Sequence, residues 1–104
     1  MKPTLSSAKN RPNQSIDFAF PAPAAREVWL VGDFNGWDPS ALPMKKNADG
    51  RWHVTVALRP GRHEYRFFAD GVWLDDPGAE MKTSNTMGGE NCVRIVVGRR
   101  SLIL

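Results

Sequence analysis

The strict alternation of residues 51 to 58 restricts the fold of this chain more than any other feature. Its apolar members, which would share one face, are Trp52, Val54, Val56 and Leu58. Successive side chains of an extended strand point to opposite faces, so a period of two predicts a strand with one buried face. Shorter alternating runs occur at residues 16–20, 63–69 and 91–97. In the last of these runs we expect the inward residues to be Val93, Ile95 and Val97.

Turn-forming dipeptides separate these runs. Asp49-Gly50 tolerates the positive φ angles of a tight hairpin. Pro60-Gly61 and Asp70-Gly71 then reverse the chain, which predicts a three-stranded meander over residues 51 to 74. Residues 75 to 90 lack any period and are dense in turn-forming residues, so we expect one long loop there.

The spacing of the runs predicts the fold class. About seven short strands without any helical period are typical of an all-β protein, here an antiparallel immunoglobulin-like β-sandwich. A chain of 104 residues fits a single domain. We expect the sandwich to occupy residues 15–97, with a flexible polar tail at residues 1–14 and a short C-terminal tail at residues 98–104.

Charge and cysteine content restrict the partners and the compartment. Fourteen Lys and Arg against eleven Asp and Glu give a net charge of +3, but five of the basic residues lie in the tails, which contain no acidic residue. Residues 15–97 therefore carry nine basic and eleven acidic groups. A basic groove for nucleic acid is not expected. Cys92 is the single cysteine, and no signal peptide or membrane span is visible, so we expect a cytoplasmic protein without a membrane partner.

Two of the four tryptophans lie outside the long strands. Trp37 falls in a loop rich in Gly, Asn and Asp, and Trp73 follows a hairpin turn. Exposed aromatic rings often mark a contact surface. The C–H face of a glucose ring can stack on an indole, and Arg66, Asn35 and Asn91 could bind its hydroxyls. The residues alone leave a second interpretation open, in which both rings cap the ends of the sandwich.

Three strings between residues 28 and 97 carry a family resemblance. They are VWLVGDFNGWD (28 to 38), PGRHEYRFFADGVWLDDP (60 to 77) and TMGGENCVRIV (86 to 96). In order and spacing they resemble the glycogen-binding module of the AMP-activated protein kinase β subunit. They are equally similar to the N-terminal sandwich domains of glycogen branching enzymes and isoamylases, the family called carbohydrate-binding module 48.

The resemblance implies non-catalytic binding of an α-1,4-glucan such as glycogen or starch, with no cofactor. In kinase-type members two tryptophans stack on glucose, a lysine and an asparagine bind hydroxyls, and a leucine pushes through the curved glucan. These roles fall on Trp37, Trp73, Arg66, Asn91 and Met87. Arg66 thus replaces a lysine and Met87 a leucine. A threonine expected near Gly89 is missing, which removes one hydrogen bond.

Other functions are weaker interpretations. Glycoside cleavage needs paired carboxylates. The candidates are Asp33, Asp38, Asp70, Asp75 and Asp76, all of a residue type that turns favour, so we expect no catalytic residue and no enzyme. His53 and His63 lack partners at metal-ligand spacing, so no metal site is expected. The main alternative is a protein-interaction or regulatory sandwich that has lost sugar affinity. For a glucan-binding module, a further expected partner is a glucan-metabolising enzyme or a kinase that it serves in trans.

Overall fold

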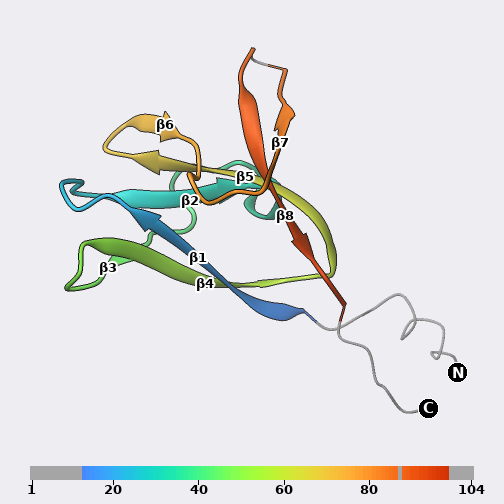
Figure 1. Cartoon of the computed structure of the whole chain (residues 1–104), viewed down its shortest axis with the longest axis horizontal. Helices are drawn as coiled ribbons and strands as arrows, with labels where there is room; N and C mark the ends of the chain where they lie inside the picture. Colours follow the sequence, from blue (N-terminus) through green and yellow to red (C-terminus); the bar gives the residue numbers. More distant parts are fainter. Residues whose placement is uncertain (1–12, 87, 99–104) are drawn as a thin grey trace, which may run out of the picture.

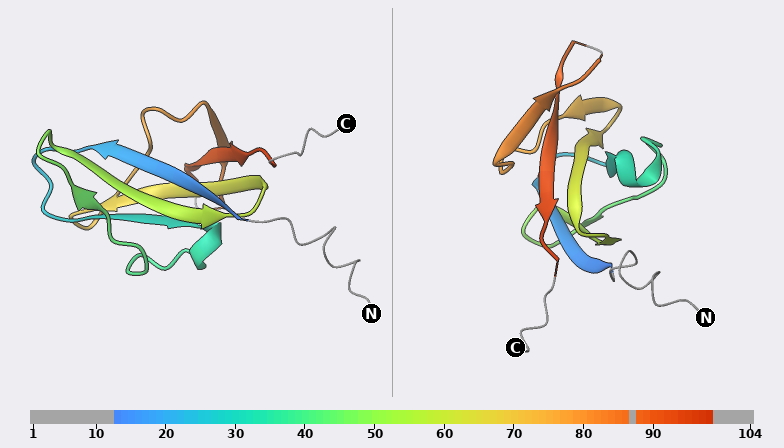
Figure 2. Two further views of the ribbon diagram at one scale, coloured as in Figure 1. Left: turned by 90° about the horizontal axis from the view of Figure 1, so that it is seen from below. Right: turned by 90° about the vertical axis from the view of Figure 1, so that its right-hand side faces the viewer.

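A computed structural model describes residues 13–86 and 88–98 and shows two antiparallel sheets packed face to face (Figures 1 and 2). The strands are β1 (Gln14–Pro21), β2 (Val28–Gly32), β3 (Lys45–Lys46), β4 (Arg51–Leu58), β5 (Gly61–Ala69), β6 (Val72–Leu74), β7 (Met81–Ser84) and β8 (Glu90–Val96). A 3-10 turn, η1 (Asp33–Asn35), follows β2. The predicted all-β sandwich is confirmed. Within the described residues no helix is long and apolar enough to cross a membrane.

The first sheet has the order β1-β4-β3, and the second has the order β2-β5-β8-β7 with β6 also paired to β5. Aromatic rings from the two sheets meet in the core. Phe20 of β1 lies 4.5 Å from Phe67 of β5, and Phe18 meets Tyr65 edge to face at 4.9 Å, both distances between ring centroids. The alternation in β1, β4 and β5 predicted these inward faces, because each strand has one face buried and one in solvent.

The predicted meander over residues 51 to 74 is wrong in its first half. β4 already pairs with β1 on one edge and with β3 on the other. Since both edges are occupied, β5 crosses to the second sheet instead of pairing with β4. The second half is confirmed: β5 and β6 form a hairpin, in which Asp70 and Gly71 have φ angles of 48° and 82°.

The predicted inward face of the last strand is wrong for Ile95 and Val97, although Val93 is buried. β8 pairs with β5 in a register that sets Cys92 opposite the fully buried Tyr65, and Cys92 is itself buried. Ile95 and Val97 are therefore on the exposed face, 48% and 75% accessible. A shift of one residue exchanges the two faces of a strand, and only the partner strand sets that choice. Cys92 is therefore a small core residue.

Arg94 is on the inner side of β8 rather than the outer. Its guanidinium lies 5.1 Å from the centre of the Phe18 ring and donates to the Asp17 carbonyl of β1 at 3.4 Å. The side chain thus covers the edge of the core where β8 passes β1, and its charge stays half exposed at the rim.

Residues 75 to 90 are not one loop, because they contain β7. This strand pairs with β8 through Met81↔Val93 and Thr83↔Asn91. It lies at the edge of the sheet with three of its four residues exposed, so no alternation marks it in the sequence. Figure 1 shows β7 and β8 projecting from the sandwich as a hairpin. The predicted tails fall mostly outside the described residues, although Gln14 already belongs to β1.

Candidate functional site

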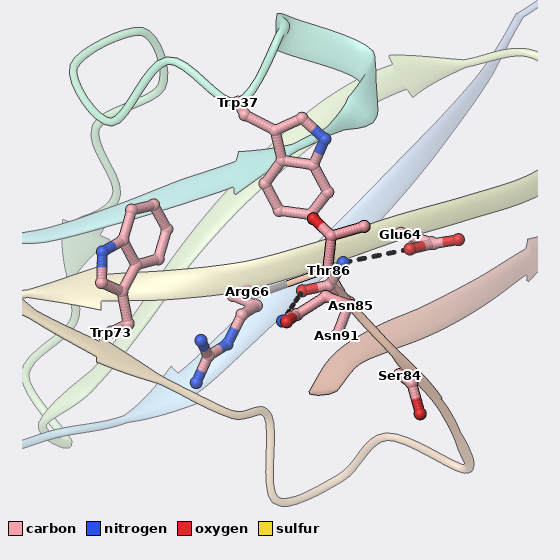
Figure 3. Close-up of a pocket in the computed structure, with 8 residues that line it drawn as sticks. All are labelled: Trp37, Glu64, Arg66, Trp73, Ser84, Asn85, Thr86 and Asn91. Atoms are coloured by element: carbon pink, nitrogen blue, oxygen red, sulfur yellow. Dashed lines mark hydrogen bonds between the residues drawn. The ribbon is translucent and has the colours of Figure 1, made fainter. Parts of the chain in front are cut away.

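A pocket opens where β5 changes its partner strand. The same edge of β5 pairs with β8 over Gly61–Tyr65 and with β6 over residues 67–69. Arg66 lies between the two stretches, where β6 ends and β8 begins. A pocket of about 570 Å³ opens on this outer face of the sheet (Figure 3). Its lining residues are Trp37, Glu64, Arg66, Trp73, Ser84, Asn85, Thr86 and Asn91.

The loop after β2 carries Trp37, and hydrogen bonds inside the loop fix its conformation. The Asn35 amide accepts from the Gly32 amide N–H at 3.1 Å and donates to the Leu30 carbonyl at 3.1 Å. Asp33 accepts from the Glu64 amide N–H of β5 at 2.9 Å, which ties the loop to the pocket wall. Gly32 permits this close approach, because a Cβ there would lie 2.6 Å from the Glu64 carbonyl oxygen.

Trp37 has an unusual backbone conformation. Its φ angle is +61°, in the left-handed region that residues with a Cβ rarely adopt. Its amide N–H donates to the Gly32 carbonyl at 2.9 Å, which closes the loop beneath it. The indole is half-buried and lines the pocket. Strained backbone of this kind persists where the surrounding structure enforces it, and it concentrates at binding sites.

Trp73 reaches the pocket from β6, and Figure 3 shows it on the far side of Arg66 from Asn91. Its ring packs on Phe68 of β5 with the centroids 4.8 Å apart and the planes tilted by 47°. The other face of the strand pair is core, so the two rings stand on the outer surface. Trp73 keeps 40% of its surface exposed. An indole that is braced underneath and open above can stack on a planar apolar face.

Arg66 supplies the pocket with a cation. Its Nε and Nη2 groups donate to the same Asp75 oxygen, Oδ1, at 3.2 and 2.9 Å. Lys82 of β7 approaches the other Asp75 oxygen at 3.6 Å. A guanidinium has five N–H donors, so three remain for a ligand.

Asn91 belongs to a chain of hydrogen bonds across the pocket wall (Figure 3). Its Nδ2 donates to Glu64 at 3.0 Å, and its Oδ1 accepts from the Asn85 amide at 3.1 Å. The bond from Asn91, with a second from Arg62, holds the pKa of the Glu64 carboxyl below its usual value. These two bonds fix the orientation of the buried Asn91 amide, and one N–H and one carbonyl lone pair take no part in them.

The structure brings together four of the six residues that the sequence singled out: Trp37, Trp73, Arg66 and Asn91. Asn35 does not line the pocket, because its side chain is bonded inside the loop. Met87 lies outside the described residues.

Four lining residues escaped the sequence analysis: Glu64, Ser84, Asn85 and Thr86. Glu64 could have been found, since it is two positions from Arg66 on the same face of one strand. The other three lie at the end of β7 or directly after it, and the sequence did not predict that strand. Thr86 supplies a hydroxyl to the pocket, although at another position than the threonine missing near Gly89.

Each aspartate considered as a catalytic candidate binds a structural partner. Asp38 accepts from Ser40, and Asp70 from the amide N–H groups of Arg26 and Glu27. Asp76 accepts from the Tyr65 hydroxyl at 2.5 Å. Asp33 and Asp75 hold Glu64 and Arg66, as described above. Over residues 13–86 and 88–98, no group of three or more acidic, His or Cys side chains is placed to hold a metal ion.

Burial raises the pKa of two groups beneath the pocket, the Tyr65 hydroxyl and the Cys92 thiol. Tyr65 is buried and donates to the Asp76 carboxylate, and burial first, then that bond, raises the pKa of its hydroxyl far above the usual range. Burial also raises the pKa of the Cys92 thiol, which accepts from the Asp76 amide N–H at 3.2 Å. Neither group is prepared as a nucleophile, because each is held in its neutral form.

Comparison with known proteins places residues 15–99 in a match to the family described as the glycogen recognition site of AMP-activated protein kinase. The 1,4-alpha-glucan-branching enzyme 1 of Pisum sativum is 39% identical over 75 residues, 64% of this chain and 9% of that enzyme. Protein PTST homolog 2 of Arabidopsis thaliana is 38% identical over 73 residues, 70% of this chain and 13% of that protein.

The 5'-AMP-activated protein kinase subunit beta-1 of Rattus norvegicus is 34% identical over 70 residues, 67% of this chain and 25% of that subunit. The chain therefore spans between 9% and 25% of the length of these three relatives.

Proposed function

The chain belongs to the family of the glycogen recognition site of AMP-activated protein kinase, and from that premise we propose that it binds an α-1,4-glucan such as glycogen or starch without cleaving it. The observation that carries the proposal is the pocket itself. Two indoles, Trp37 and Trp73, line it together with the donors and acceptors of Arg66 and Asn91. Indole faces suit the C–H side of glucose, and the polar groups suit its hydroxyl rim.

The size and openness of the site support a chain rather than a single sugar. The pocket holds about 570 Å³ on the outer face of a sheet, and Trp73 is 40% exposed. A polymer can enter such a surface from the side and continue past it. The bound units would contact Trp37 from the loop after β2 and Trp73 from β6.

Non-catalytic binding is supported by the engagement of the acidic groups. Glycoside cleavage requires one carboxyl group to donate a proton and a second to act as base or nucleophile. Glu64 is the acidic residue in the pocket wall, and its two oxygens accept from Asn91 and Arg62. These bonds favour its ionised form, which cannot act as the acid.

Partners and compartment are proposals of a different kind. A branching enzyme and a kinase subunit are among the relatives, so we propose that the chain brings a glucan to such an enzyme or kinase. The cytoplasmic location expected from the single Cys92 stays a prediction.

The test is retention on a glycogen affinity gel. We expect the wild-type chain to be retarded and the double variant Trp37→Ala, Trp73→Ala to migrate freely, because both stacking surfaces are lost. Trp29→Ala is the matched control, since Trp29 does not line the pocket. Free migration of the wild-type chain would overturn the proposed function. Equal retention of the double variant would overturn the site.

A further inference from the structure

We propose that Asp75 is a positioning residue of this site, which holds Arg66 in the orientation that receives a glucan. The inference rests on the proposed function. Arg66 lies between the stretches of β5 that pair with β8 and with β6, so neither strand places a residue opposite it on that edge, and its side chain is 23% exposed. An unrestrained arginine has several rotamers, and a ligand would have to order it on binding.

The bonds to Asp75 remove that freedom. One Asp75 oxygen accepts from both Nε and Nη2, which fixes one edge of the planar guanidinium group. The end of the group has a second pair of donors, one N–H of Nη1 and the other N–H of Nη2. Within the described residues these donors have no bonded acceptor. Two parallel donors match two hydroxyls on neighbouring carbons of a pyranose, which is a geometry that a lysine cannot offer.

Asp75 is itself anchored through the next residue. The Asp76 amide N–H donates to the buried Cys92 thiol at 3.2 Å, and the Asp76 carboxylate accepts from the buried Tyr65 hydroxyl and from the Gly78 amide N–H. The segment after β6 is therefore fastened to the core one residue beyond Asp75. This attachment keeps the Asp75 carboxylate beside β5, although its side chain is 38% exposed.

Lys82 on β7 offers a matched control. Its Nζ lies 3.6 Å from the second Asp75 oxygen, and it does not line the pocket. An exposed ion pair of this kind contributes little by itself. Removal of Lys82 leaves both bonds between Asp75 and Arg66 in place. Removal of Asp75 breaks them.

The experiment is a double-mutant cycle with β-cyclodextrin as the probe. Affinity is measured by NMR titration of the tryptophan indole signals, so that weakened variants remain measurable. We expect Asp75→Ala to weaken binding about fivefold, equivalent to about 1 kcal/mol, and Lys82→Ala to leave it within about twofold. In the Arg66→Ala background, Asp75→Ala should have no further effect, because Asp75 acts through Arg66.

A second measurement does not depend on glucan. The Nε–H signal of Arg66, assigned by its loss in Arg66→Ala, should be observed in the free wild-type chain and should shift or broaden in Asp75→Ala. An unchanged signal would overturn the inference. So would equal losses of affinity from Asp75→Ala in both backgrounds, which indicate a general structural effect. If the wild-type chain binds neither β-cyclodextrin nor glycogen, the proposed function fails, and the inference falls with it whatever the Nε–H signal shows.

Discussion

Replacement of Trp37 by alanine and, separately, by glycine measures the strain in the loop that presents the first ring. Both changes remove the indole, so both should abolish retention on glycogen. They differ only in whether a Cβ remains at a φ angle of +61°. The difference between the two variants therefore isolates the backbone contribution, because the lost packing of the ring is common to both.

The magnitude follows from two opposing effects. A residue with a Cβ in the left-handed region costs roughly 1–2 kcal/mol, which glycine avoids. Glycine also makes the unfolded chain more flexible, which lowers the free energy of unfolding by about 0.4–1 kcal/mol relative to alanine. The net expectation is that Trp37→Gly is more stable than Trp37→Ala by about 1 kcal/mol, which raises the melting temperature by roughly 5 °C in a domain of this size.

Trp73 provides the control, since it lies in β6 and is not among the residues with positive φ in the described part of the chain. At Trp73 the alanine variant should be the more stable of the two, because glycine within a strand lowers stability by about 0.5–1 kcal/mol relative to alanine. Urea denaturation of the four single variants gives the comparison. If Trp37→Gly is less stable than Trp37→Ala by the same margin as at Trp73, the loop is not strained and the reasoning is refuted.

Two further predictions concern the groups under and beside the pocket. Tyr65→Phe leaves the Asp76 carboxylate without its 2.5 Å hydrogen bond and should lower the free energy of unfolding by about 2 kcal/mol in urea; a change below about 0.5 kcal/mol would contradict it. The pKa of Glu64 is lower in the folded chain than its usual 4.5, so its stabilisation is present above that pH and is lost as the pH falls through the folded value. The urea midpoint of the wild-type chain should therefore fall more steeply than that of Glu64→Gln on acidification below about pH 4.5, and parallel curves would exclude this role.

Two of the sequence-based errors have one cause. The alternation of β4 and β5 identified the strands and their buried faces, but not that the edges of β4 are filled by β1 and β3. In β8 both faces carry apolar residues, so the pattern could not choose between Val93 with Ile95 and Cys92 with Val96. Pairing with β5 decided it. Strand partners lie far apart along the chain, and local periodicity contains no information about them.

The candidate site likewise has features that the sequence predicted and others that only the structure revealed. The sequence by itself, through its turn signals, its outward-facing positions and its resemblance to a family, singled out Asn35, Met87 and the four residues Trp37, Trp73, Arg66 and Asn91. As ligands of a glucan they stay predictions.

Only the tertiary structure decided that these four side chains line one pocket and that Asn35 instead holds the Trp37 loop. It also revealed that two of them are bonded to carboxylates, Asn91 to Glu64 and Arg66 to Asp75. The physical reason is that a residue's type sets what it can bind, whereas its partner and orientation depend on strands that fold against it from elsewhere in the chain.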